Sequence, residues 1–490
     1  MSPAFEYVAV GTLDEALARI RQHGDDAKVL AGGQSLVPLL HYRLADPRVV
    51  VDINDLPLAR IAEDNGRLRL GALVRHHQLE ESDAIARRCP VLREAAALIG
   101  NVRVRALGTI GGSLAHADAA AELPMVTLAL DGRFTLASTG GMRTVAARDF
   151  FVGPLTTVMR PDELLTEIDV EAPPATGWAI EEIARRAGDF ALVAVTALVG
   201  LDRQGRVTRA RLAFGGVAPT PVRAAAAEEA LVGHEPTPER LARVATLARD
   251  GLNPQSDAFV SGAYRRHLAG VLARRALARA VDRSEARERA GACERSEAGE
   301  RAGACERSEA GERAGACERS EARERAGAVA PGSPRVQMKL VINGRTREVD
   351  APPDATLLAV LRDTLGIFDV KEGCDEGVCG ACTVLLDARP VSSCLLLAAG
   401  VRGRPIMTVK GLEGPSGLHP LQEAFVRHGA VQCGFCTPGM LLTALVFLER
   451  NPRPRRDEIR RALEGNLCRC TGYTKIIDAI EAYAREDGRG

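Results

Sequence analysis

Eight of the twelve cysteines form two groups of four in the last quarter of the chain. The first group has the pattern C-x4-C-x2-C with a fourth cysteine further along, which is the spacing of plant-type 2Fe–2S proteins. Thiolates are the soft, charge-donating ligands that such clusters need, and glycines at 377 and 380 let a loop wrap around one. Structural zinc is the alternative, although zinc favours paired short spacings. The expected ligands are Cys374, Cys379, Cys382 and Cys394.

The second group combines C-x2-C with C-x-C. Thr437 and Pro438 predict a helix start beside it, with the threonine as cap and the proline in the first helical position. Partial positive charge at that helix start would favour thiolates and an anionic cluster. The spacing alone fits zinc about as well as iron, but the neighbouring plant-type motif favours a second 2Fe–2S cluster. Its ligands would be Cys433, Cys436, Cys468 and Cys470.

Two glycine pairs lie in the first quarter of the chain, and each follows an apolar pattern typical of a strand. Glycine pairs let backbone N–H groups approach a pyrophosphate, and neighbouring hydroxyls can add hydrogen bonds. Neither pair is part of a G-x-G-x-x-G motif, so a Rossmann site is not predicted. A tight turn would explain one such pair as well. The two motifs comprise Ala31, Gly32, Gly33, Gln34, Ser35 and Leu36, and Thr109, Ile110, Gly111, Gly112 and Ser113.

A repeat divides the chain into two parts. Residues 283–330 hold four copies of a twelve-residue unit without Leu, Ile, Phe, Tyr or Trp, so the unit has no large apolar face to bury. We interpret 283–335 as a linker that permits transient helix and would span on the order of 40 Å as a coil. Cys293, Cys305 and Cys317 recur in it at intervals of twelve, which repeat copying explains better than metal binding.

The two parts differ in their expected elements. Residues 1–282 alternate helical and strand patterns, with a helix over 13–20, strands over 28–31 and 190–201, and a helical tail over 237–281. Residues 338–412 are expected to be strand-rich with one helix near 355–365, and 413–490 mostly helical. The predicted domains are 1–175, 176–282, 336–412 and 413–490, in an α+β multidomain architecture.

Overall composition excludes several classes of protein. The formal net charge is zero, so no basic surplus points to nucleic acid. The longest apolar run, 190–201, is too short to span a bilayer. The first residues lack the basic and apolar segments of a signal peptide. We therefore expect a cytoplasmic protein in which grouped cysteines serve metal or redox chemistry rather than disulfides.

The C-terminal part resembles the small iron–sulfur subunit of the molybdenum hydroxylases, the xanthine dehydrogenase and aerobic carbon-monoxide dehydrogenase family. The resemblance rests on KEGCDEGVCGAC at 371–382, QCGFCTPG at 432–439 and GNLCRCTGY at 465–473. It implies a β-grasp ferredoxin domain followed by a four-helix domain, whose cluster lies nearest the molybdopterin of a partner chain. Gln432 and Cys470 match family positions that approach that pterin. Asp375 stands where many members have glycine.

The N-terminal part resembles the FAD-binding medium subunit of the same family, whose fold is of the vanillyl-alcohol-oxidase type. Besides the glycine motifs, the matches are AAELP at 120–124, ELL at 163–165 and ARRAGDFA at 184–191. The resemblance implies that both glycine motifs hold the diphosphate and ribityl chain, and that Glu122 bonds near the adenosine end or the ribityl region. Leu165 and Phe190 would lie near the isoalloxazine ring, whereas His116 is interpreted as structural.

This resemblance implies an electron-transfer subunit that carries FAD and two 2Fe–2S clusters but no catalytic residue of its own. Electrons would enter at the 433/436/468/470 cluster, pass to the 374/379/382/394 cluster and leave through FAD. Substrate oxidation would take place on a large molybdopterin-binding subunit, in a dimer of heterodimers. A self-contained NAD(P)H-linked flavin and iron–sulfur reductase, and a non-enzymatic iron–sulfur scaffold or sensor, are the alternatives.

Overall fold

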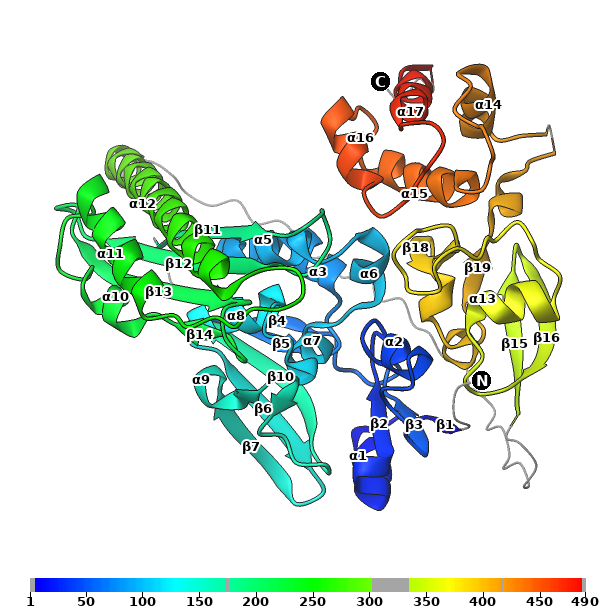
Figure 1. The fold of residues 1–490 in the computed structure, drawn as a ribbon, viewed down its shortest axis with the longest axis horizontal. Helices are drawn as coiled ribbons and strands as arrows, with labels where there is room; N and C mark the ends of the chain where they lie inside the picture. The colour runs from blue at the N-terminus through cyan, green and yellow to red at the C-terminus, as the bar shows by residue number, and fades with distance from the viewer. Residues whose placement is uncertain (1–4, 172–175, 302–334, 416, 487–490) are drawn as a thin grey trace.

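The computed structural model describes residues 5–171, 176–301, 335–415 and 417–486 (Figure 1). Helices and strands mix in the N-terminal part, a small sheet follows, and the chain ends in a group of helices. The part of the repeat that follows residue 301, which includes Cys305 and Cys317, lies outside the described residues, as does the side chain of Cys293. No described helix combines the length and apolar character needed to cross a membrane.

The chain opens with a small parallel sheet of order β1-β3-β2. The helix predicted over 13–20 is confirmed as α1. Thr12 caps it by accepting a hydrogen bond from the backbone N–H of Glu15 at 3.2 Å, and its apolar face is buried. The first glycine pair is the turn between β2 and α2. The elements are β1 (Glu6–Ala9), α1 (Leu13–His23), a 3₁₀ turn (Gly24–Asp26), β2 (Ala27–Leu30), α2 (Leu36–His41) and β3 (Val49–Asp52).

A five-stranded antiparallel sheet of order β4-β5-β10-β6-β7 comes next, with helices packed on it. Its strands are β4 (Ile61–Asp64), β5 (Arg67–Gly71), β6 (Arg133–Ser138), β7 (Gly141–Ala146) and β10 (Leu164–Glu171), and a two-stranded ribbon is formed by β8 (Phe151–Gly153) and β9 (Thr156–Thr157). The helices are α3 (His76–Glu81), α4 (Asp83–Arg88), α5 (Pro90–Leu98), α6 (Val102–Leu107), α7 (Ile110–His116), α8 (Glu122–Ala129) and α9 (Ala147–Phe150).

The second glycine pair is preceded by helix α6, so the strand expected before it is wrong. Val102, Val104 and Ala106 alternate with other residues, which imitates the two-residue period of a strand. The side chain of Asn101 accepts hydrogen bonds from the backbone N–H groups of Arg103 and Val104, at 3.1 and 3.4 Å. This cap starts a helix instead.

A four-stranded antiparallel sheet, β11-β12-β13-β14, completes the N-terminal part. Every residue of β12 is buried. The strand expected over 190–201 begins at 193, because 190–192 belong to a loop. The helical tail is two helices rather than one. The elements are β11 (Thr176–Ile183), β12 (Val193–Leu201), β13 (Val207–Gly215), β14 (Val222–Arg223), α10 (Ala225–Glu229), α11 (Pro238–Asp250) and α12 (Gly262–Arg301).

Helix α12 continues into the repeat, so the packed domain extends beyond the expected boundary at 282. The guanidinium groups of Arg283 and Arg287 lie 4.7 and 4.5 Å from the ring centre of Trp178, on β11. Ser284 is buried between them. Arginine stacking on an aromatic face supplies the contact that the apolar-poor repeat otherwise lacks.

The C-terminal part begins with a five-stranded sheet of order β16-β15-β19-β17-β18. The helix expected near 355–365 is a short α-helix that runs into a π-helical turn. The elements are β15 (Val336–Ile342), β16 (Arg345–Ala351), α13 (Leu357–Ala359), the π turn (Val360–Thr364), β17 (Thr383–Leu386), β18 (Arg389–Ser392), β19 (Pro405–Met407) and 3₁₀ turns over Ser393–Leu395, Ala398–Val401 and Val409–Leu412.

The last described region consists of four helices around their own apolar core. The predicted helix start is displaced by one residue: Cys436 is the N-cap, and Thr437 and Pro438 are the first two helical residues. Threonine is therefore not the cap, because the backbone already turns helical at the cysteine. The helices are α14 (Pro420–Arg427), α15 (Thr437–Arg450), α16 (Arg456–Ala462) and α17 (Thr474–Glu486).

The N-terminal and C-terminal parts dock through α6, which packs against β18 of the C-terminal sheet, and α2 lies beside this part in Figure 1. Tyr42 donates a hydrogen bond to Glu376. The carboxylate of Glu81 accepts hydrogen bonds from both Nη atoms of Arg389, each 3.1 Å long, and also pairs with Arg450. One carboxylate therefore joins three regions of the chain. These ion pairs are partly exposed and each contributes less than about 1 kcal/mol.

Candidate cofactor sites

A cavity of about 960 Å³ lies between the subdomains of the N-terminal part and reaches the C-terminal part. Thirteen of the fourteen residues predicted to bind FAD line it. The exception is Ile110, which is buried in the core behind the cavity. A cavity of this size is typical of a large organic cofactor. The predicted residues that line it are Ala31, Gly32, Gly33, Gln34, Ser35, Leu36, Thr109, Gly111, Gly112, Ser113, Glu122, Leu165 and Phe190.

The two glycine motifs pack against each other at this cavity. A Cβ atom on Gly32 would lie 2.8 Å from the Cα of Gly108 and closer still to the carbonyl oxygen of Leu107. Gly33 has a φ of +73°, which a larger residue rarely adopts. The side-chain amide of Gln34 donates to the carbonyl of Gly32 at 2.9 Å. Its Oε1 is buried and has no hydrogen-bond partner among the described residues, so it could accept a hydrogen bond from a bound cofactor.

The second motif is a tight turn into α7. The hydroxyl of Thr109 accepts a hydrogen bond from the backbone N–H of Gly112 at 3.0 Å. Gly111 lies against Ala72, so that a Cβ atom on it would come within 2.7 Å of the Ala72 carbonyl oxygen. Glycine is needed here because two backbone segments approach closely. The loop thereby presents its backbone to the cavity.

Both polar and apolar residues line the cavity. Glu122 begins α8 and is buried, and this burial raises the pKa of its carboxyl group to about 8. Burial thus favours the protonated carboxyl group, which can donate a hydrogen bond. Leu165 on β10 is buried, whereas Phe190 is 60% exposed in its loop. His116 lines the cavity, and burial lowers its pKa.

Sequence reasoning missed several residues of this cavity. His76 lines it with both ring nitrogens buried and without a partner among the described residues. Phe259 comes from the loop before α12, and Arg265 comes from α12 itself. Gly377 and Val378, from the cysteine loop, also line it. A buried histidine has no local sequence signal, and the other residues meet only through folding.

The loop over 374–382 brings the first cysteine group together. Gly377 and Gly380 have φ values of +73° and +72°, and Asp375 also has a positive φ, +55°, which explains why glycine suits that position. The sulfur of Cys374 accepts hydrogen bonds from the backbone N–H groups of Glu376 and Cys379, at 3.4 and 3.3 Å. Backbone N–H groups that point at sulfur are what an anionic iron–sulfur site requires.

The first four thiols are arranged as two pairs. A hydrogen bond from the Cys379 thiol lowers the pKa of Cys374 to about 5, and one from Cys394 lowers the pKa of Cys382 to about 7. The pKa of each donor thiol is raised. Two pairs of adjacent sulfurs, one pair for each iron, are the donor set that a two-iron cluster uses, so the residues fit the group.

The second group has the same paired arrangement. The sulfurs of Cys433 and Cys470 lie 3.4 Å apart, and Cys436 hydrogen-bonds with Cys468. The backbone N–H of Cys468 donates to the hydroxyl of Tyr473 at 3.0 Å, which fixes the second half of the loop. The thiols lie as pairs: across the described residues, no three His, Cys, Asp or Glu side chains form a group that could hold one metal ion.

The two cysteine loops touch each other directly. The backbone N–H of Leu467, next to Cys468, donates to the carbonyl of Cys379 at 2.9 Å. The side-chain amide of Asn466 donates to the carbonyl of Gly380 at 3.3 Å. The first loop therefore contacts the second cysteine loop and also lines the large cavity, which Glu464, Gly465 and Leu467 of the second loop line as well. The three candidate sites thus lie close together.

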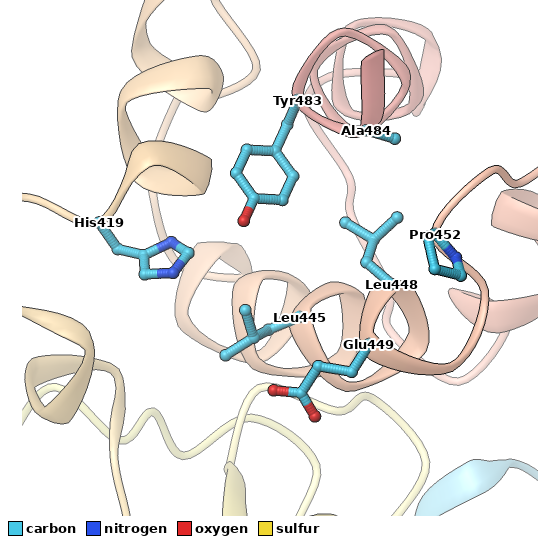
Figure 2. Close-up of a pocket in the computed structure, with 7 residues that line it drawn as sticks. All are labelled: His419, Leu445, Leu448, Glu449, Pro452, Tyr483 and Ala484. Carbon is cyan, nitrogen blue, oxygen red and sulfur yellow. The ribbon is translucent and has the colours of Figure 1, made fainter. Parts of the chain in front are cut away.

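A smaller cavity of about 140 Å³ lies in the helical region between α14, α15 and α17 (Figure 2). His419, Leu445 and Tyr483 line it, and the picture shows the imidazole and the phenol ring directed toward the same space. None of the predicted cofactor residues contributes to this cavity.

Comparison with known proteins assigns a family domain to each region. Residues 3–173 match the FAD binding domain in molybdopterin dehydrogenase, and 178–280 match the CO dehydrogenase flavoprotein C-terminal domain. Residues 340–404 match a 2Fe-2S iron-sulfur cluster binding domain, and 408–481 match a second [2Fe-2S] binding domain. The chain thus joins an FAD-binding region to two 2Fe–2S domains.

Individual relatives agree. The nicotine 6-hydroxylase medium subunit of Paenarthrobacter nicotinovorans is 38% identical over 283 residues, which cover 58% of this chain and 99% of the relative. The small subunit of the same enzyme is 51% identical over 148 residues, 30% of this chain and 89% of the relative. A solved structure of carbon monoxide dehydrogenase from Hydrogenophaga pseudoflava, which lacks the Mo-pyranopterin moiety, matches with a TM-score of 0.56 and 38% identity over 58% of this chain and 99% of that one.

Proposed function

Because the chain belongs to the molybdenum hydroxylase family as a fused FAD and 2Fe–2S subunit, we propose that it carries electrons from a molybdopterin site on a partner chain to FAD. When bound, each cluster would move single electrons and the flavin would store two. Electrons enter at the 433/436/468/470 site, pass the 374/379/382/394 site and leave from the flavin for an external acceptor. The partner oxidises an aldehyde, an aromatic heterocycle or carbon monoxide.

One observation carries this proposal: the first cysteine loop touches both other sites. The hydrogen bond from the N–H of Leu467 to the carbonyl of Cys379, 2.9 Å long, joins it to the second cysteine group. Gly377 and Val378 of the same loop line the large cavity. Electron transfer requires short edge-to-edge separations, which these contacts favour. Glu464, Gly465 and Leu467 of the second loop line the cavity too, so the proposed order rests on burial: Cys382 and Cys394 are buried, whereas Cys433 and Cys470 are exposed.

The outer cysteine site supports the entry point. Cys433 and Cys470 are exposed, and so is Gln432. Within two residues of Cys433 along the chain, Phe435 exposes 45% of its surface and Val431 exposes 39%. Exposed apolar side chains beside exposed ligands are typical of a docking surface. We assign this surface to the molybdopterin-binding subunit, in a complex with two copies of each chain.

The test is rapid anaerobic reduction of the complex purified from its native host, with molybdenum, pterin, iron and flavin measured in the same preparation. We expect substrate to reduce the iron–sulfur absorbance first and the flavin absorbance afterwards. Cys470→Ser should stop flavin reduction by substrate and leave flavin reduction by dithionite unchanged. If the chain purifies without a molybdenum partner and NAD(P)H reduces its flavin directly, the proposed direction of electron flow is wrong.

A further inference from the structure

Arg103 is a completely buried cation from the flavin-binding part that lies inside the iron–sulfur part. It is on α6, and it is the largest side chain among those that are fully buried. Its Nε donates to the hydroxyl of Ser392 at 2.9 Å, its Nη1 to the side-chain oxygen of Asn466 at 3.0 Å and its Nη2 to the carbonyl of Gly465 at 2.6 Å. One guanidinium therefore joins the flavin-binding part, the ferredoxin domain and the helical domain.

The same guanidinium also faces the first cysteine loop. Its Nη2 lies within 3.5 Å of the carbonyl oxygens of Gly377 and Val378, two residues of that loop. Its charge interacts with all four thiols of the first group, Cys382 most strongly. The glycines around it leave the necessary room: a Cβ atom on Gly380 would come within 3.0 Å of Nη1 and one on Gly465 within 2.8 Å of Nη2.

No carboxylate among the described residues lies within ion-pair distance of Arg103. A buried charge normally has a partner of opposite sign, because transfer from water to a dry interior costs several kcal/mol. Neutral carbonyl, amide and hydroxyl groups satisfy its hydrogen bonds but do not balance its charge. The nearby source of negative charge is the group of four thiolates, and a cluster that they hold becomes more negative on reduction.

We infer that Arg103 is a positioning residue for the ferredoxin-domain cluster, through which the flavin-binding part raises the reduction potential of that cluster. A fixed positive charge in a low-dielectric interior favours the state with the additional electron. The docking of α6 thus sets the potential of the site next to the flavin. Arg103 would bias electrons toward the flavin side of the chain. The inference rests on the proposed ligands of this cluster, but it does not depend on the direction of electron flow.

The test compares three variants of the full chain in its complex: Arg103→Gln, Arg103→Lys and Arg105→Gln. Glutamine keeps hydrogen-bonding capacity without charge, whereas lysine keeps the charge without the planar fork. Arg105 is the matched control, because it lies on the same helix but pairs with Glu80 at 3.0 Å instead of facing the cysteines. The potentials of the two clusters are followed separately by EPR during redox titration.

We expect Arg103→Gln to lower the potential of the ferredoxin-domain cluster and to leave that of the helical-domain cluster unchanged. Arg103→Lys should retain most of the original potential, and Arg105→Gln all of it. An unchanged potential in Arg103→Gln, or equal shifts of both clusters, would overturn the inference. If the glutamine variant loses its iron, retention of the cluster in Arg103→Lys supports a role of the charge, and loss in both variants rejects it. Absence of a 2Fe–2S signal in the unmodified chain would instead reject the proposed ligands.

Discussion

Gly439 and Gly380 meet across the boundary between the helical domain and the ferredoxin domain, so closely that a Cβ atom on Gly439 would overlap the carbonyl oxygen of Gly380. Gly439 is in the first turn of α15, three residues after Cys436, and Gly380 lies between Cys379 and Cys382. The contact therefore packs the helix that follows Cys436 directly against the loop that carries Cys379 and Cys382. Only a residue without a side chain allows it.

Gly439→Ala is predicted to separate the two cysteine loops. Overpacking of this kind costs about 1–3 kcal/mol, which would be relieved by movement of one domain away from the other. Electron transfer between the clusters should slow severalfold, as measured by stopped-flow absorbance under anaerobic conditions. Gly414→Ala is the control, because nothing lies within 4 Å of a Cβ atom there. Equal rates in both variants would contradict the importance of this contact.

Gly32→Ala is predicted to lower the FAD content of the purified protein. The added methyl group would collide with the backbone at Leu107 and Gly108, and so push the two glycine motifs apart. The ratio of flavin absorbance to protein, measured after extensive dialysis, should fall by more than half. Gly11→Ala has free space around its Cβ and should keep the original ratio. Full flavin content in Gly32→Ala would show that these motifs do not hold the cofactor.

Asp375→Gly is predicted to strengthen the first cysteine loop. The φ of +55° at this position strains any residue with a side chain, and glycine relieves about 1 kcal/mol of that strain. The cluster absorbance should therefore bleach more slowly in the presence of an iron chelator. Asp375→Val should bleach faster than the unmodified protein. Asn65→Gly, which removes a similar strain at φ +47° in an exposed turn of the other part, should have no effect.

His76 is predicted to make the flavin-binding part sensitive to acid. Burial lowers the pKa of His76 to about 4, so the folded protein keeps the ring neutral where the unfolded chain binds a proton. Its contribution is complete above the unfolded value of about 6.5 and is lost as the pH falls toward 4, on the order of 3 kcal/mol in total.

The measurement for this prediction is the denaturant midpoint of the full chain between pH 4.5 and 7, followed by the fluorescence of Trp178, the single tryptophan. His76→Leu should flatten the pH dependence, whereas His428→Leu, at an exposed position, should not. A slope that is unchanged in His76→Leu would mean that another group causes the acid sensitivity.

The amino-acid sequence alone determined the chemistry of this protein. Cysteine spacing is local information, and the loop over 374–382 carries three of the four expected ligands of the first 2Fe–2S site, with Cys394 twelve residues further along. Apolar periodicity likewise predicted α1 and most of β12. Where local signals competed, the sequence misled: V-R-V-R imitated a strand, yet the cap at Asn101 made it a helix. The start of α15 moved by one residue because the backbone is already helical at Cys436, whose side chain makes no capping hydrogen bond.

The tertiary structure decided how the sites are connected. Gln34 and Leu165 are 131 residues apart and line one cavity only because two sheets pack together. Arg103 lies in the V-R-V-R pattern that imitates a strand and carries no sequence signal of burial, but the docking of α6 buries it against residues almost 300 to more than 360 positions away. Burial and long-range proximity depend on how the whole chain packs, so no local pattern encodes them. These long-range contacts determine where the candidate cofactor sites lie relative to one another.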